Sequence, residues 1–161
     1  MRHFKTKPSN NQQLKMIEKV KNRLNFIIDK VPNILSEISE ENMSVKPLPT
    51  KWSKKEIIGH LIDSATNNHQ RFVRGQFENI PEIRYDQNKW NEFGFYQHID
   101  SKQIISFWTI YNKQLLEIIK RIPTENLKRQ IKVGENILTI EFLIADYVEH
   151  LEHHLKQIID Y

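Results

Sequence analysis

A chain of 161 residues, 39% of them hydrophobic, can bury one core, so we expect a single domain over residues 1–161, with residues 1–10 flexible. The absence of cysteine excludes disulfides, thiolate metal ligands and a cysteine nucleophile, and no stretch reaches the ~18 apolar residues that a membrane span requires. The formal net charge of +4 comes from lysines spread along the chain without a nucleic-acid-binding motif, so we expect a cytoplasmic protein with no nucleic-acid or membrane partner.

The composition favours helices, because four glycines and six prolines leave little material for the turns of an all-β fold. From Gln12 onward, apolar residues recur at helical spacing, which predicts a first helix. Pro32 is expected to interrupt this helix with a kink or a short second piece, since proline removes a backbone donor. Pro47 and Pro49 then mark a loop that ends at Lys51.

Two capping signals mark the start of the second helix. Ser53 and Glu56 form a capping box, and Trp52 and Ile57 form a hydrophobic staple around the cap. Together these signals fix the register of a helix that is expected to end near Phe77.

The connection over residues 78–99 is rich in aromatic residues and has no helical or strand pattern. A connection of this length is often a binding segment, so it can serve as a lid over a site. Its Trp90 is a candidate for lining a substrate pocket; packing in the core or anchoring of the loop is the alternative.

Two further helices complete the pattern. Asp100 or Ser101 can cap a third helix, which Pro123 ends. Residues 127–138 fit either a short hairpin or a plain loop, and a fourth helix begins near Thr139 and continues almost to the C-terminus. The four amphipathic segments predict an all-α fold, a single four-helix bundle.

Three of the seven histidines crowd into the fourth helix. A lone histidine beside an apolar stripe is most often structural, but His150 and His154 are spaced i, i+4 and share one helical flank. Their imidazoles can therefore bind one metal ion, whereas His153 is expected to point to solvent. His69 and His98 have no partner at ligand spacing and are expected to be structural or exposed.

The second helix carries a matching polar row beside its apolar stripe, at i, i+4, i+7 and i+11: His60, Ser64, Asn67 and Arg71. In an antiparallel bundle this row can face the fourth helix, so that His60 completes a three-histidine site. Exposure of the row to solvent is the alternative. Arg71 could bind a substrate carboxylate or pair with an acidic side chain.

Three neutral imidazoles suit zinc, nickel or another late first-row metal and leave coordination positions open. An ion held by neutral ligands keeps its full charge and lowers the pKa of a neighbouring water or thiol. No Glu or Asp on the metal-facing rows offers itself as a general base, which weakens the case for hydrolysis. Asp146, one turn before His150, could accept a hydrogen bond from that histidine, but a solvated surface charge is the favoured interpretation.

Taken together, these residues resemble the DinB/YfiT-like superfamily of metal-dependent enzymes, and most closely its YfiT-like branch of bacillithiol transferases and metal-dependent hydrolases. The resemblance extends from about the middle of the first helix to the C-terminus. The segments that carry it are Lys51-Trp52-Ser53, His60-Leu61-Ile62-Asp63-Ser64, Asn67, Arg71-Phe72, Tyr85-Asp86, Trp90, His150-Leu151-Glu152-His153-His154 and Gln157-Ile158. In that family the matching histidines bind the metal, which here implies His60, His150 and His154.

The resemblance also implies an up-down-down-up order of the helices, a homodimer, and one zinc or nickel ion bound at one end of the bundle. Some members transfer a low-molecular-weight thiol such as bacillithiol to an electrophile. We therefore predict a metal-dependent thiol S-transferase acting on a small molecule, with Asn67, Arg71 and Trp90 as substrate contacts. The alternatives are a hydrolase that activates water and a non-catalytic, metal-binding stress-response bundle.

Overall fold

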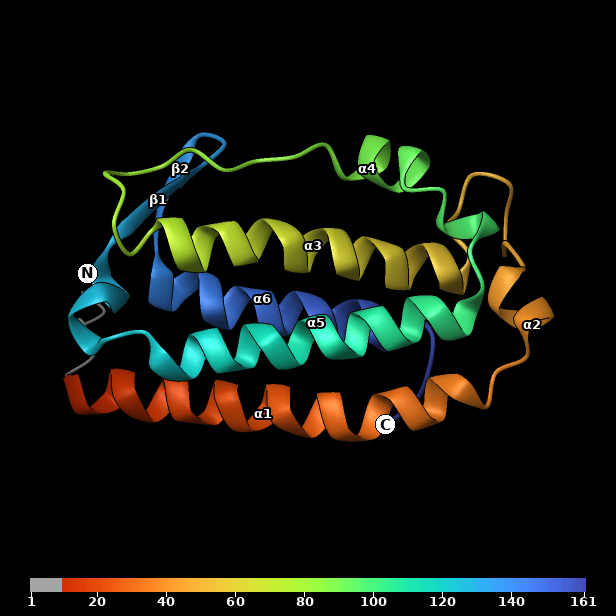
Figure 1. The fold of residues 1–161 in the computed structure, drawn as a ribbon, viewed down its shortest axis with the longest axis horizontal. Coiled ribbons are helices and arrows are strands. Elements are labelled where there is room, and N and C mark those ends of the chain that lie inside the picture. Colours follow the sequence, from red (N-terminus) through yellow and green to blue (C-terminus); the bar gives the residue numbers. More distant parts are fainter. Residues whose placement is uncertain (1–9) are drawn as a thin grey trace, which may run out of the picture.

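Four long helices form a bundle in the computed structural model, which describes residues 10–161 (Figure 1). They are α1 (Asn10–Ser36), α3 (Lys54–Arg74), α5 (Ser101–Arg121) and α6 (Ile140–Leu155). The predicted all-α four-helix bundle is confirmed. The predicted flexibility of residues 1–10 concerns a segment that, apart from Asn10, lies outside the described residues.

The helix directions follow the up-down-down-up order that the family resemblance implied. Along the colour gradient of Figure 1, α1 and α6 run one way, whereas α3 and α5 run the other way. Both α1 and α3 pack against α5 and α6. Because α3 and α5 are parallel, the chain between them has to return along the length of α3, which is about 30 Å for a helix of 21 residues.

Residues 75–100 form this return segment, and they contain regular structure that the sequence did not indicate. The short helix α4 (Gln87–Phe93) begins after the N-cap Asp86 and packs against α3, and the 3-10 helix η1 (Tyr96–His98) follows. The prediction of a connection without regular structure over 78–99 is therefore wrong. A helix of seven residues is too short to be recognised by its hydrophobic period.

The remaining short elements lie at the two ends of the bundle. Helix α2 (Glu40–Ser44) follows α1, and the 3-10 helix η2 (Thr124–Lys128) follows α5. Strands β1 (Gln130–Val133) and β2 (Asn136–Thr139) pair as an antiparallel hairpin, so the hairpin alternative for this segment is the correct one. Gly134 occupies its turn with a φ of 61°, a conformation that favours glycine.

Pro32 does not interrupt the first helix. Helix α1 continues through it to Ser36, and the next helical piece begins only at Glu40. The prediction of a second helical piece at Pro32 is therefore wrong, whereas the kink stays a prediction. A proline inside a helix costs about 3 kcal/mol, but Val31 and Leu35 on either side of it are fully buried, and their packing holds this turn against the core.

The capping box at the start of α3 is confirmed. The Ser53 hydroxyl accepts a hydrogen bond from the Glu56 backbone amide at 3.2 Å, and the Ser53 amide donates to the Glu56 carboxylate at 2.7 Å. Residues Trp52 and Ile57 of the predicted staple line the same pocket. The helix ends at Arg74, slightly before the predicted end near Phe77.

Replacing Ser53 by alanine is expected to lower the free energy of unfolding by about 1 kcal/mol, because an amide in the first turn of α3 loses its acceptor. The substitution also removes the hydrogen bond from the Ser53 hydroxyl to Gln97 Oε1. Urea unfolding followed by circular dichroism measures the change. Ser36→Ala is the matched control, since its exposed hydroxyl bonds only to its own helix; equal losses in both variants would contradict the capping argument.

The core between the four helices is aliphatic around three large rings, those of Phe72, Trp108 and Tyr147. The hydroxyl of Tyr147 donates to Asn112 Oδ1 at 2.5 Å, so its polar end is satisfied within the core. Buried apolar residues form one stripe on α5 and another on α6, among them Ile104, Leu115, Leu143 and Leu151. Within residues 10–161, no helix has the length and apolar character needed to cross a membrane.

Candidate metal centre

Three histidine rings converge where the first half of α3 meets the end of α6. His60, His150 and His154, which we call the histidine triad, each contribute a ring nitrogen, and these three nitrogens lie within 4.8 Å of one another. The Nε2 atoms of His60 and His150 are 3.1 Å apart. The structure thus brings together the three histidines that the sequence predicted as one group.

Helical periodicity explains how α6 presents two of these rings. Tyr147 and Leu151 are buried in the core, while His150 and His154 are partly buried on the flank that faces α3. His153 is exposed, as predicted. The facing row on α3 is buried throughout, which excludes the solvent-exposed alternative; its exposed fractions are 0% for His60, 4% for Ser64, 2% for Asn67 and 8% for Arg71.

The electrostatics of the triad favour neutral imidazoles. Burial, and then the neighbouring rings of His150 and His154, lower the pKa of His60 to about 3. Burial, and then the positive charge that His154 would carry, lower the pKa of His150 to about 4. The pKa of His154 is lowered chiefly by burial as well. All three rings are therefore unprotonated at neutral pH, the state in which an imidazole nitrogen can bind a metal.

The geometry of the triad also fits a shared ion. Two imidazole nitrogens bound to one tetrahedral ion lie about 3.3 Å apart when each bond is ~2.0–2.1 Å, and the two Nε2 atoms are 3.1 Å apart. The Nδ1 atoms of His60 and His154 are buried and have no hydrogen-bond partner among the described residues. Because the Nε2 atom of His60 faces His150, its Nδ1 atom lies on the other side of the ring, so an ion between the rings binds Nε2 and leaves Nδ1 without a partner.

Two neighbours hold the rings in place. The indole of Trp52 packs on His60 with ring centroids 4.9 Å apart, and the hydroxyl of Ser64 lies 3.5 Å from His150 Nδ1. Asp146 is exposed, and within the described chain no hydrogen bond joins it to His150, which agrees with its interpretation as a surface charge. Ser64 therefore takes the orienting position that the sequence offered to Asp146.

A buried carboxylate, which the sequence pattern did not indicate, lies beside the polar row. Asp63 is 4% exposed, and its Oδ1 accepts a hydrogen bond from the Tyr96 hydroxyl at 2.5 Å. Its Oδ2 is buried and has no partner among the described residues. Burial raises the pKa of Asp63 to about 6, although the bond from Tyr96 opposes this shift.

The Tyr96 ring reaches Asp63 because a glycine makes room for it on α3. A Cβ at Gly59 would lie 2.1 Å from the Tyr96 ring. The period of the second helix could have placed Gly59 and Asp63 on one face, one turn apart. It could not have supplied Tyr96, which comes from the return segment far along the chain.

The return segment contributes a second phenol to this region. Tyr85 lies close enough to Asp63 and Arg71 to interact with them electrostatically, and burial raises its pKa. The Arg71 guanidinium donates to Asn68 Oδ1 at 3.3 Å and to the Ile83 carbonyl at 3.2 Å. The buried Asp63, Ser64 and Arg71 form a polar cluster with the half-buried Tyr85, and this cluster adjoins the triad through Ser64 and His150.

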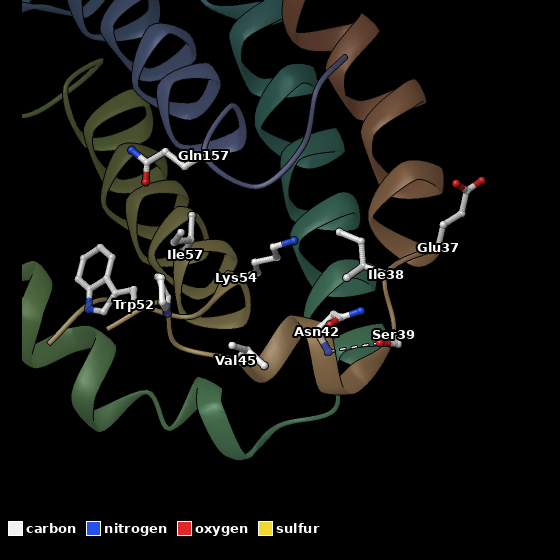
Figure 2. Close-up of a pocket in the computed structure, with 10 residues that line it drawn as sticks. Glu37, Ile38, Ser39, Asn42, Val45, Trp52, Lys54, Ile57 and Gln157 are labelled. Atoms are coloured by element: carbon white, nitrogen blue, oxygen red, sulfur yellow. Dashed lines mark hydrogen bonds between the residues drawn. The ribbon is translucent and has the colours of Figure 1, made fainter. Parts of the chain in front are cut away.

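An open cleft lies beside the triad at the end of the bundle. Its larger lobe has a volume of about 700 Å³ and its smaller lobe about 570 Å³, and both are lined by Trp52, Ile57 and Gln157. Figure 2 shows side chains from the end of α1, from α2, from the start of α3 and from the turn after α6 around the larger lobe. Trp52, which lines both lobes, also packs on His60, so one side chain contacts both the cleft and the triad.

Comparison with known sequences establishes the family. A sequence model described as the DinB superfamily matches residues 23–158. The chain belongs to the DinB superfamily. Among its relatives is "Putative metal-dependent hydrolase YfiT" of Bacillus subtilis, 25% identical over 142 residues that cover 83% of this chain and 79% of the relative. "Putative metal-dependent hydrolase OB0782" of Oceanobacillus iheyensis is 24% identical over 128 residues, which cover 78% of this chain and 74% of the relative.

Solved structures share the DinB fold. The structure of YfiT, described as having an unusual four-helix bundle topology, superposes with a TM-score of 0.79 at 21% identity and covers 98% of this chain and 89% of its own. A mycothiol-dependent maleylpyruvate isomerase matches with a TM-score of 0.63 at 9% identity, over 92% of this chain and 60% of that one. At these identities the likeness establishes the arrangement of the helices.

The three residues predicted as substrate contacts in this DinB-superfamily chain do not line the cleft. Asn67 and Trp90 line a separate hollow of about 430 Å³ beside the return segment, and Asn67 donates to the Asp63 carbonyl. Arg71 makes the hydrogen bonds described above and forms no ion pair at salt-bridge distance within the described chain. Their role as substrate contacts stays a prediction.

Proposed function

We propose that the chain is a metal-dependent enzyme in which His60, His150 and His154 bind one divalent ion, zinc or nickel. The observation that supports this most directly is the convergence of three ring nitrogens within 4.8 Å from two different helices. Three neutral nitrogen ligands satisfy only part of the coordination shell of either metal. Open positions are typical of catalytic sites, whereas structural sites are closed.

A divalent ion in the triad supplies positive charge that lowers the pKa of a thiol or water beside it. The protein's own part is to hold the rings. Trp52 packs on the face of His60, and Ser64 lies at the Nδ1 atom of His150, so both rings are fixed before an ion or a substrate arrives. Burial and mutual repulsion keep the rings unprotonated.

We favour transfer of a low-molecular-weight thiol to a small electrophile as the reaction. The chain contains no cysteine, so the thiol has to come from a co-substrate. A thiol can lose its proton directly to solvent at neutral pH once its pKa is lowered, and it then reacts without a general base. A reaction without a general base suits this site, because within residues 10–161 no carboxylate forms a hydrogen bond with the nitrogens of the triad.

Hydrolysis is the second candidate, and two observations favour it. The relatives YfiT and OB0782 carry the name of metal-dependent hydrolases. In addition, the polar cluster beside the triad contains Asp63, whose pKa of about 6 lies in the range of a general base that works near neutral pH. The predicted homodimer stays a proposal alongside either reaction.

Two measurements on the purified chain test the proposal. Elemental analysis compares the wild type with a His60→Ala, His150→Ala, His154→Ala triple variant after incubation with zinc or nickel, and we expect about one ion per wild-type chain and almost none in the variant. Negligible metal in both overturns the proposal. Turnover of the electrophile 1-chloro-2,4-dinitrobenzene with and without added cysteine, and of the ester p-nitrophenyl acetate without thiol, then separates thiol transfer from hydrolysis.

A further inference from the structure

The larger lobe of the cleft contains one cation that has no counter-ion among the described residues. Lys54, at the start of α3, extends into the lobe with its ammonium group directed toward Ile38 at the end of α1 (Figure 2). Of the described residues, Glu37 is the only acidic one in the wall of this lobe, and its carboxylate points away from Lys54 into solvent. The lobe therefore presents a single positive charge to whatever enters it.

The neighbouring lysines differ from Lys54 because their charges are already paired. Lys55 binds the carboxylate of Glu40, and Lys46 binds that of Glu56 at 2.7 Å. The carboxylates of Glu40 and Glu56 are therefore already paired with other lysines. Within residues 10–161, no salt bridge or hydrogen bond involves the Lys54 ammonium.

We propose that Lys54 binds the carboxylate of a small acidic substrate in this lobe, so that the other end of the substrate lies against the triad. The inference rests on the proposed function of the triad and deepens it by naming a substrate class. The distance to be covered is short, because Trp52 lines the lobe and also packs on His60. Gln157 lines the lobe as well, and its backbone amide donates to the His154 carbonyl at 3.1 Å.

The chemistry of the lobe selects a carboxylate rather than a phosphate. A single lysine matches one negative charge, whereas a phosphate dianion is usually held by several cations or by a row of backbone amides. The rest of the wall includes apolar groups, among them Ile38, Val45 and the indole of Trp52, which suit a short hydrocarbon chain. A volume of about 700 Å³ is within the range of small-molecule sites.

Binding of two simple thiols tests the inference without an activity assay. The probes are 3-mercaptopropionate, which carries a carboxylate, and 2-mercaptoethanol, in which a hydroxyl replaces it. Quenching of tryptophan fluorescence is titrated for the nickel-loaded and the metal-free protein. The variants are Lys54→Met, which removes the charge, Lys54→Arg, which keeps it, and Lys30→Met, an exposed lysine of α1 that gives the same change in net charge.

We expect Lys54→Met to weaken binding of 3-mercaptopropionate about tenfold in both protein forms and to leave binding of 2-mercaptoethanol unchanged. Lys54→Arg and Lys30→Met are expected to stay within about twofold of the wild type. Equal affinities of Lys54→Met and Lys30→Met for 3-mercaptopropionate overturn the inference, even if nickel binds. If nickel fails to bind, the proposed function falls, while the Lys54 effect in the metal-free protein still decides the role of the lobe.

Discussion

Replacing His60 by alanine is expected to reduce the affinity for zinc or nickel by about three orders of magnitude, because one of three ligands is lost and the two that remain come from a single helix. The rise in melting temperature that metal gives the wild type should disappear at the same time, since an ion that no longer bridges α3 and α6 stabilises the folded state less. Competition titration with a chromophoric chelator and thermal melts with and without metal measure both effects.

His153→Ala is the matched control for this experiment. It removes a histidine from the same cluster in sequence, but the side chain is exposed and is not one of the three converging ligands. Its metal affinity should stay within about twofold of the wild type. Equal affinities of the His60→Ala and His153→Ala variants would show that the ion binds elsewhere on the chain.

The Asp63→Asn substitution is expected to change the free energy of unfolding of the metal-free protein more favourably at neutral pH than at acid pH. Burial raises the pKa of the Asp63 carboxyl from 3.8 to about 6 in the folded state. Between these values the folded protein holds a proton that the unfolded chain has released, so this group lowers the unfolding free energy as the pH rises from about 4 to about 6. The loss amounts to about 2 to 3 kcal/mol, and it is absent from the variant because an asparagine side chain does not titrate.

Urea unfolding of the wild type and of Asp63→Asn at pH 4 and pH 7 measures this difference. The gap in unfolding free energy, variant minus wild type, should grow by about 2 to 3 kcal/mol between the two pH values. The histidines titrate alike in both proteins, so their contribution cancels in the gap. Asp160→Asn, a change at an exposed aspartate, should leave the gap independent of pH, and a constant gap for Asp63→Asn would contradict a raised pKa.

Asp63 matters for the choice between the two candidate reactions. A carboxylate with a pKa of about 6 is mostly ionised at neutral pH, yet it is held in a buried position, and its Oδ2 has no hydrogen-bond partner among the described residues. A variant that keeps metal binding but loses only thiol-independent turnover would place Asp63 in hydrolysis. Unchanged turnover would leave it a structural partner of Tyr96.

The amino-acid sequence by itself determined the long helices and the histidine triad. Apolar residues at helical spacing located all four helices, and the capping box at Ser53 fixed the register of α3. The i, i+4 spacing of His150 and His154 follows from the helical period alone, as does the polar row that starts at His60. These features are local, so they can be read from neighbouring positions of the chain.

Only the tertiary structure decided which distant residues surround the triad. Tyr96 reaches Asp63, and Trp52 reaches both His60 and the cleft, through contacts that depend on how the return segment and the loop before α3 fold back on the bundle. The lack of a counter-ion at Lys54 within the described chain likewise depends on the partners that Lys46 and Lys55 find. Helical periodicity specifies the face of each helix, but it carries no information about which side chain from another segment packs on that face.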